Sequence, residues 1–127
     1  MSERMTAAAF RAGKAEKAAK PRKNKFNAKR VTIDGREYDS KAEARRGELL
    51  ITLEKAGKIG GLERQRRFPL LSSSGELITT YVCDFAYWSH ERDRFVVEDV
   101  KGVETPVFKL KRKMMRALLG IEVEVVR

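Results

Sequence analysis

The chain has 127 residues, a length typical of one small domain, and its net charge of +10 indicates a polyanionic partner. Nucleic acid is the first candidate for that partner, and an anionic membrane surface is the second. The single cysteine excludes an internal disulfide and a zinc site of several thiolates, and no apolar run approaches the roughly 20 residues of a membrane span. The N-terminus lacks the apolar stretch of a secretory signal, so we expect a cytoplasmic protein.

The positive charge is concentrated at the N-terminus. Residues 1–30 hold ten Lys and Arg against two Glu, a surplus of eight, whereas the rest of the chain has a surplus of only two. With little apolar surface to dock it, this segment is predicted to be a disordered basic arm. A plain solubility tail stays open as an alternative to phosphate binding. The candidate nucleic-acid contacts nearest the domain are Lys23, Lys25, Lys29 and Arg30.

The predicted domain covers residues 31–127 and begins with a hairpin and a helix. Asp34-Gly35 lies between two short β-like segments, 31–33 and 36–38, which is typical of a tight hairpin. A helix is predicted from Ser40 to Gly57. Its buried stripe is predicted from apolar residues at helical spacing, namely Ala42, Leu49, Leu53 and Ala56.

Three strands, a second helix and a last strand are predicted to follow. The strands cover residues 61–71, 77–88 and 95–102, and residues 121–126 form the last strand. The second helix, 105–120, is predicted to start near Pro106 and to bury Val107, Leu110, Met114 and Leu118. The sequence therefore predicts a single α/β domain with a mixed central sheet flanked by helices.

Acidic residues interrupt two of the predicted strands. In "VVEDVKG", alternation places Val97, Asp99 and Lys101 on one face and Glu98 on the other. We expect Glu98 to cap or pair with the second helix. Asp84, in "YVCDFAY" on the neighbouring strand, has apolar neighbours and needs a partner, because an isolated buried carboxylate is costly. A lysine, a divalent metal or both would serve.

Two aspartates that converge from adjacent strands offer the hard anionic oxygens that Mg²⁺ prefers. Such a site in a basic protein favours phosphodiester hydrolysis. Asp84, followed after 14 residues by Asp99-Val100-Lys101, resembles the signature of the PD-(D/E)xK nuclease superfamily. The order helix, three strands, helix, strand is similar to the α-β-β-β-α-β restriction-endonuclease-like core of that superfamily. Over about residues 30–127, the stretches "DSKAEARRGELL", "LERQRRFPL", "YVCDFAY" and "VVEDVKG" resemble small phage-encoded, resolvase-like endonucleases.

The resemblance implies a role for each matching residue. Asp84 and Asp99 would bind Mg²⁺ or Mn²⁺, with the Val100 carbonyl and Glu43 as further ligands. Lys101 would contact the attacking water and the scissile phosphate, and we expect it to stay protonated. A supporting role falls to Gln65. Cys83 stands where the name of the superfamily has a proline.

DNA, branched DNA included, is the expected substrate, and such substrates are often cut by homodimers. The face formed by Lys109, Lys113 and Arg116 on the second helix either contacts phosphates or is simply solvated.

Blander interpretations stay open beside these roles. Glu43 lies three residues after Ser40 and so fits a helix capping box. Asp99 and Lys101 could form an ordinary edge-strand ion pair. Tyr81, Phe85, Tyr87 and Trp88 are expected in the core, although Trp88 could stack on a base. The alternative function is a non-catalytic nucleic-acid-binding protein, and a further one is an inactive relative that acts as an assembly factor.

Overall fold

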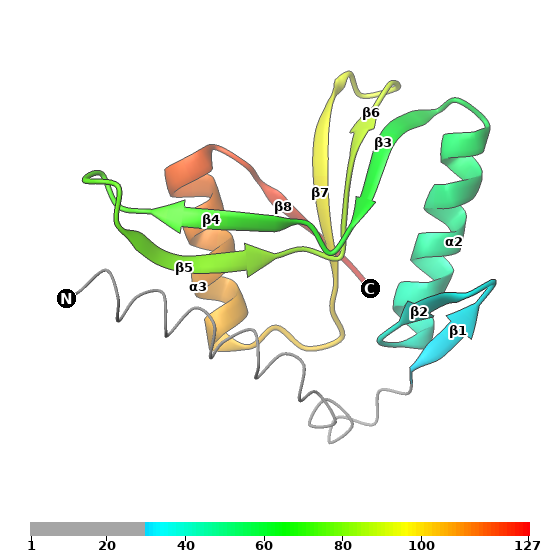
Figure 1. Cartoon of the computed structure of the whole chain (residues 1–127), viewed down its shortest axis with the longest axis horizontal. Helices are drawn as coiled ribbons and strands as arrows, with labels where there is room; N and C mark the ends of the chain where they lie inside the picture. The colour runs from blue at the N-terminus through cyan, green and yellow to red at the C-terminus, as the bar shows by residue number, and fades with distance from the viewer. Residues whose placement is uncertain (1–29) are drawn as a thin grey trace. The chain divides into compact units, whose positions relative to one another are not determined.

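The computed structural model describes residues 30–127, and Figure 1 shows the course of the chain. The described residues fall into two units, one that ends at Lys41 and one that covers residues 42–127. In the first unit, β1 (Val31–Ile33) and β2 (Arg36–Tyr38) form an antiparallel hairpin. Asp34 and Gly35 connect them with φ angles of 49° and 80°, so the predicted tight turn is confirmed. The predictions for Lys23, Lys25 and Lys29 lie outside the described residues.

The second unit begins within the first helix, α2 (Lys41–Lys55). Gly57 follows with a φ of 79°, the left-handed conformation that ends many helices. The predicted buried stripe was wrong. Leu49 and Ala56 are exposed, and the buried residues are Glu43, Ala44, Gly47 and Leu50. The inward face therefore includes a carboxylate, which a search for apolar periodicity cannot find.

Two of the three predicted strands are each divided into two. The first becomes β3 (Ile59–Arg64) and β4 (Arg67–Leu71), and the second becomes β5 (Leu77–Val82) and β6 (Phe85–Ser89). β4 pairs with β5 in a two-stranded ribbon of its own. In Figure 1 this ribbon leaves the main sheet at the point where β3 ends and β6 begins.

The main sheet has the strand order β3-β6-β7-β8. β7 (Arg94–Val100) is antiparallel to β6 and parallel to β8 (Val123–Val126), so the sheet is mixed as predicted. Both β6 and β7 are central strands. Phe85 pairs with Glu98 in this antiparallel register, so Asp84, which precedes Phe85, lies next to Asp99, which follows Glu98.

The second helix is α3 (Pro106–Met114), continued by a π-helical turn, η2 (Met115–Leu119). Thr105 Oγ1 accepts a hydrogen bond from the Phe108 amide, and Pro106 occupies the first turn as predicted. The predicted stripe was wrong here too, because Val107, Leu110 and Leu118 are exposed. Phe108 and Met115 are buried instead, against the β4–β5 ribbon and one face of the main sheet.

The predicted class is confirmed: residues 42–127 form a mixed α/β fold with a mixed sheet and two helices. No helix within residues 30–127 is long and apolar enough to cross a membrane.

Candidate active site

Asp84 lies where the chain passes from the β4–β5 ribbon into the main sheet. Its amide donates to the Glu98 carbonyl at 3.1 Å, and its own carbonyl accepts from the Gln65 amide at 3.1 Å. Its side chain also accepts a hydrogen bond, from the Val100 amide to Oδ2 at 2.8 Å. Backbone hydrogen bonds to Gln65 and Glu98 fix the position of Asp84 at this crossover, the junction between the ribbon and the sheet, and the Val100 amide orients its carboxyl group.

Asp99 reaches the same place from β7. It is only 3% exposed, and its Oδ2 accepts a hydrogen bond from the Tyr81 hydroxyl. Lys101 Nζ lies 3.5 Å from Asp99 Oδ1, so the predicted pairing on one face of the strand is confirmed. The alternative of an exposed edge-strand ion pair is wrong, because β7 lies between β6 and β8 and Asp99 is buried.

The surroundings of Asp84 oppose its ionisation. Burial raises the pKa of Asp84 to about 8, and the charge of Asp99 and then that of Glu43 act in the same direction. A hydrogen bond to the Asp99 side chain raises the pKa of Asp84 as well. The hydrogen bond from the Val100 amide lowers it, but by less than the other causes raise it. At neutral pH the Asp84–Asp99 pair therefore retains a proton unless a cation joins it.

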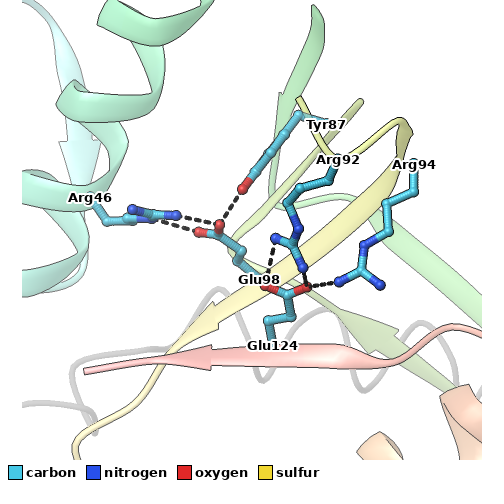
Figure 2. A network of polar contacts seen from close by, with 6 residues as sticks. All are labelled: Arg46, Tyr87, Arg92, Arg94, Glu98 and Glu124. Carbon is cyan, nitrogen blue, oxygen red and sulfur yellow. Dashed lines mark hydrogen bonds and ion pairs between the residues drawn. The ribbon is translucent and has the colours of Figure 1, made fainter. Parts of the chain in front are cut away.

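The opposite face of β7 carries a different arrangement, shown in Figure 2. Glu98, 1% exposed, accepts two hydrogen bonds from Arg46 of α2, from Nε at 2.7 Å and from Nη2 at 2.5 Å, and a third from the Tyr87 hydroxyl. The hydrogen bond to Glu98 raises the pKa of Arg46. The expectation that Glu98 would join the second helix was wrong, since its partner lies on the first.

On the adjacent strand β8, Glu124 follows the same pattern. Arg92 and Arg94 both bind its carboxylate, which lowers the pKa of Glu124 (Figure 2). On this face of the sheet, each acid is thus neutralised by arginine. Among residues 30–127, no arginine forms an ion pair with Asp84 or Asp99. Glu98 and Glu124 thus have arginine partners, whereas the Asp84–Asp99 pair has none in the described part of the chain.

Comparison with known proteins places the chain in a family. A family model described as "Protein of unknown function (DUF1064)" matches residues 23–123, which is well over half of the chain. The chain belongs to the DUF1064 family. Searches of curated proteins and of solved structures each found no match. The DUF1064 match spans the carboxylates of the Asp84–Asp99 pair and the end of the basic arm.

Several residues predicted from the sequence meet at the site of this DUF1064 protein. Glu43 lies in the first turn of α2, is 4% exposed, and is close enough for its charge to raise the pKa of Asp84. Val100 contacts Asp84 through its amide. The Gln65 amide bonds to the Asp84 carbonyl, while its side chain is exposed and its φ is 56°. Gln65 thus holds the backbone of Asp84 at the junction between the ribbon and the main sheet.

The predicted basic residues of the DUF1064 chain are not part of this cluster. Lys109 and Lys113 on α3 and Arg116 on η2 are all exposed. Arg30 forms an exposed ion pair with Glu37, with Nη2 2.6 Å from Oε1. They remain candidates for phosphate contacts outside the acidic pair.

Sequence reasoning missed three side chains that define the site and its surroundings, namely Tyr81, Arg46 and Lys111. Tyr81 was predicted as core, and it is buried, yet its hydroxyl binds Asp99. Lys111 Nζ donates to the Thr80 carbonyl at 3.1 Å from a half-buried position. Trp88, also expected in the core, is 42% exposed, so that expectation was wrong. A signal existed for Tyr81 alone: a buried tyrosine hydroxyl usually finds a partner.

The donor set of the Asp84–Asp99 pair fits a hard divalent cation in part. Within the described ranges, no group of three or more His, Cys, Asp or Glu side chains is arranged to hold a metal. One or two carboxylates are still what Mg²⁺ commonly takes from a protein, since it keeps several waters and binds substrate phosphates. The residues that could hold such an ion are Asp84 and Asp99.

Proposed function

We propose that this DUF1064 protein is a metal-dependent DNA endonuclease that hydrolyses phosphodiester bonds. The observation that carries the proposal is the Asp84–Asp99 carboxyl pair. The pKa of Asp84 is raised, and within the described residues the pair has no arginine partner of the kind that Glu98 has in Arg46. A carboxyl group whose pKa is raised by burial and by neighbouring acids, as at Asp84, is typical of functional sites. The resemblance of these residues to the PD-(D/E)xK signature supports the same activity.

In this proposal the chain's own residues have distinct tasks. Asp84 and Asp99 hold Mg²⁺ or Mn²⁺, which when bound acts as a Lewis acid on the phosphate and makes water more acidic. The Tyr81 hydroxyl fixes the orientation of Asp99. Lys101, held by Asp99, binds the phosphate and the attacking water through its Nζ. Glu43 adds negative charge from the helix side.

The substrate we propose is DNA, including branched DNA, in the cytoplasm, with cutting by a homodimer on such branched substrates. Non-specific affinity comes from the basic arm of residues 1–30 and from exposed cations on the second helix. Because these contacts would be made to phosphates, they position the DNA without reading its sequence.

A second candidate function is a non-catalytic nucleic-acid-binding protein. Both oxygens of Asp99 already have protein partners, Tyr81 and Lys101, and no three-carboxylate group is formed within residues 30–127. That observation favours a purely structural cluster. This candidate predicts salt-sensitive DNA binding that needs no Mg²⁺ and leads to no cleavage.

The deciding experiment is a cleavage assay on linear, nicked, forked and four-way-junction DNA with Mg²⁺, Mn²⁺ or EDTA. Wild type and Asp99→Asn are compared, and DNA binding of both is measured in EDTA. We expect metal-dependent cutting by the wild type, and loss of cutting with retained binding in Asp99→Asn. Binding without cutting under every metal condition would instead support the non-catalytic protein.

A further inference from the structure

Lys111 occupies an unusual position for a lysine on α3. It follows the buried Phe108 by one helical turn and so lies on the inward face of the helix. Its ammonium group donates to the Thr80 carbonyl on β5 at 3.1 Å. Its neighbours Lys109 and Lys113 are exposed, whereas Lys111 is half-buried. Lys111 is therefore directed at the β4–β5 ribbon while part of its side chain stays open to solvent.

Lys111 bonds to the same strand, β5, that supplies a hydrogen-bond partner of Asp99. Thr80 directly precedes Tyr81, whose hydroxyl binds Asp99. Lys101, which pairs with the other oxygen of Asp99, also lies 4.8 Å from the centre of the Phe108 ring. Phe108 thus contacts the ammonium group of Lys101, while the ammonium group of Lys111 extends from the next turn of the same helix.

These two ammonium groups are close enough to repel each other. Burial lowers the pKa of Lys111, and the charge of Lys101 lowers it further. Among residues 30–127, no carboxylate forms an ion pair with Lys111. The Thr80 carbonyl accepts from only one of its three N–H donors. Lys101 has the Asp99 carboxylate as its partner, whereas the positive charge of Lys111 has none among the described residues and is left for an external anion.

We propose that Lys111 is a further substrate-binding residue, which together with Lys101 clamps one phosphate of a DNA strand beside Asp99. This inference rests on the proposed function, because DNA is the anion that it assigns to the clamp. The clamp would place a phosphodiester against the Asp84–Asp99 pair, with Lys101 supplied from the end of β7 and Lys111 from α3. No covalent role falls to Lys111.

The test is the salt dependence of DNA binding by the full chain in EDTA, where no cleavage intervenes. Lys111→Met keeps the apolar stem and removes the charge, and Lys111→Arg keeps the charge. Lys55→Met, at an exposed position at the end of α2, is the matched control. We expect Lys111→Met to make the slope of log K against log salt shallower by about 0.9, the value for one phosphate contact on duplex DNA. Lys111→Arg and Lys55→Met should keep the wild-type slope.

An unchanged slope for Lys111→Met would overturn the clamp. Cleavage assays separate that failure from failure of the proposed function: if the wild type never cuts DNA but Lys111→Met still flattens the slope, the clamp stands and the nuclease does not. If the wild type cuts and Lys111→Met changes neither the slope nor kcat/KM, the nuclease stands and the clamp does not.

Folding of Lys111→Met is checked by thermal denaturation, and no loss of Tm is expected, because the variant removes a charge that is poorly solvated. A second measurement on the wild-type chain needs no substitution at Lys111. The lysine ¹³Cε resonances are followed during titration with inorganic phosphate. Two resonances that shift together at lower phosphate than the others support the clamp. Uniform shifts of all lysines contradict it.

Discussion

Asp84 is a residue whose position costs stability. Burial and two nearby acids raise its pKa to about 8, compared with an ordinary value near 4. Between these two pH values the folded state binds a proton that the unfolded state has released. The ionisation of Asp84 therefore costs no folding stability below about pH 4, costs more as the pH rises, and costs most above about pH 8. A residue that destabilises its own fold at neutral pH is consistent with selection for function.

Replacement of Asp84 tests this cost. Asp84→Asn keeps an oxygen to accept the Val100 amide and removes the charge. We expect the variant to be more stable than wild type by at least about 1 kcal/mol at pH 8, since one pKa unit corresponds to about 1.4 kcal/mol. The difference should shrink toward pH 5. Thermal denaturation in EDTA from pH 5 to pH 9 measures it, and parallel curves for the two proteins would contradict the prediction.

Lys101 provides a second test at the scale of the residue. If it acts through its charge, Lys101→Arg should keep the shape of the pH–rate profile, with a lower rate because the guanidinium is larger and planar. Lys101→Met should reduce kcat on the order of 100-fold, as when one charge-stabilising donor is removed. An essential deprotonation that vanishes in Lys101→Arg would show that Lys101 is a general base instead.

At the scale of the element, β7 divides two kinds of chemistry between its faces. One face carries Asp99 and Lys101, and the other carries Glu98, bound by Arg46 and Tyr87 (Figure 2). Because the Arg46–Glu98 pair ties α2 to the sheet, it also fixes the helix turn that bears Glu43. The pair therefore holds the helix that contributes charge to the Asp84–Asp99 pair.

We expect Arg46→Met to destabilise the protein by about 3 kcal/mol, because it leaves the Glu98 carboxylate buried without its cation. The double variant Arg46→Met with Glu98→Gln should cost less than the sum of the two single changes, since it removes both charges together. Chemical denaturation measures the cycle. Arg94→Met, which alters an exposed pair, serves as the control with little expected change. Strict additivity would show that Arg46 and Glu98 are not coupled.

Elements of this fold were predictable from the sequence to different degrees. The Asp34-Gly35 hairpin, both helices and the pairing of the Asp84 and Asp99 strands follow from local patterns. The buried helix faces did not, because Glu43 and Gly47 face inward on α2 and single large residues, Phe108 and Met115, anchor α3 and η2. The two strand breaks, at residues 65–66 and 83–84, were not predicted either. The chain passes there from one sheet to another, but no Gly or Pro marks the position.

Of the candidate site, the sequence supplied the residues on adjacent strands but not those that come from elsewhere in the fold. Asp99 and Lys101 lie on one face because strands alternate, and this was predictable. Tyr81 reaches Asp99 from the β4–β5 ribbon, and Lys111 reaches the same ribbon from α3. Their arrival depends on tertiary packing, which a single sequence does not encode in any local period.

At the scale of the whole molecule, charge is divided between the arm and the rest of the chain. Residues 1–30 carry a surplus of eight positive charges, and residues 31–127 carry a surplus of two. Many cations of the folded part are already used in ion pairs, such as those of Arg46, Arg92 and Arg94. Long-range attraction to DNA should therefore come mainly from the arm, while local contacts such as Lys101 select the phosphate that reaches the acidic pair.

Deletion of residues 1–30 separates these two contributions. For every phosphate of duplex DNA that the shortened protein no longer binds, the slope of log K against log salt becomes shallower by about 0.9, so removal of an arm that binds several phosphates should flatten the dependence by several such steps. Cleavage at saturating DNA should change far less than affinity, because the Asp84–Asp99 pair and Lys101 remain in place. Binding titrations at a series of salt concentrations, with single-turnover cleavage alongside, measure both effects. An unchanged slope would mean that the arm does not touch DNA, and the attraction would then have to come from the exposed cations of α3 and η2.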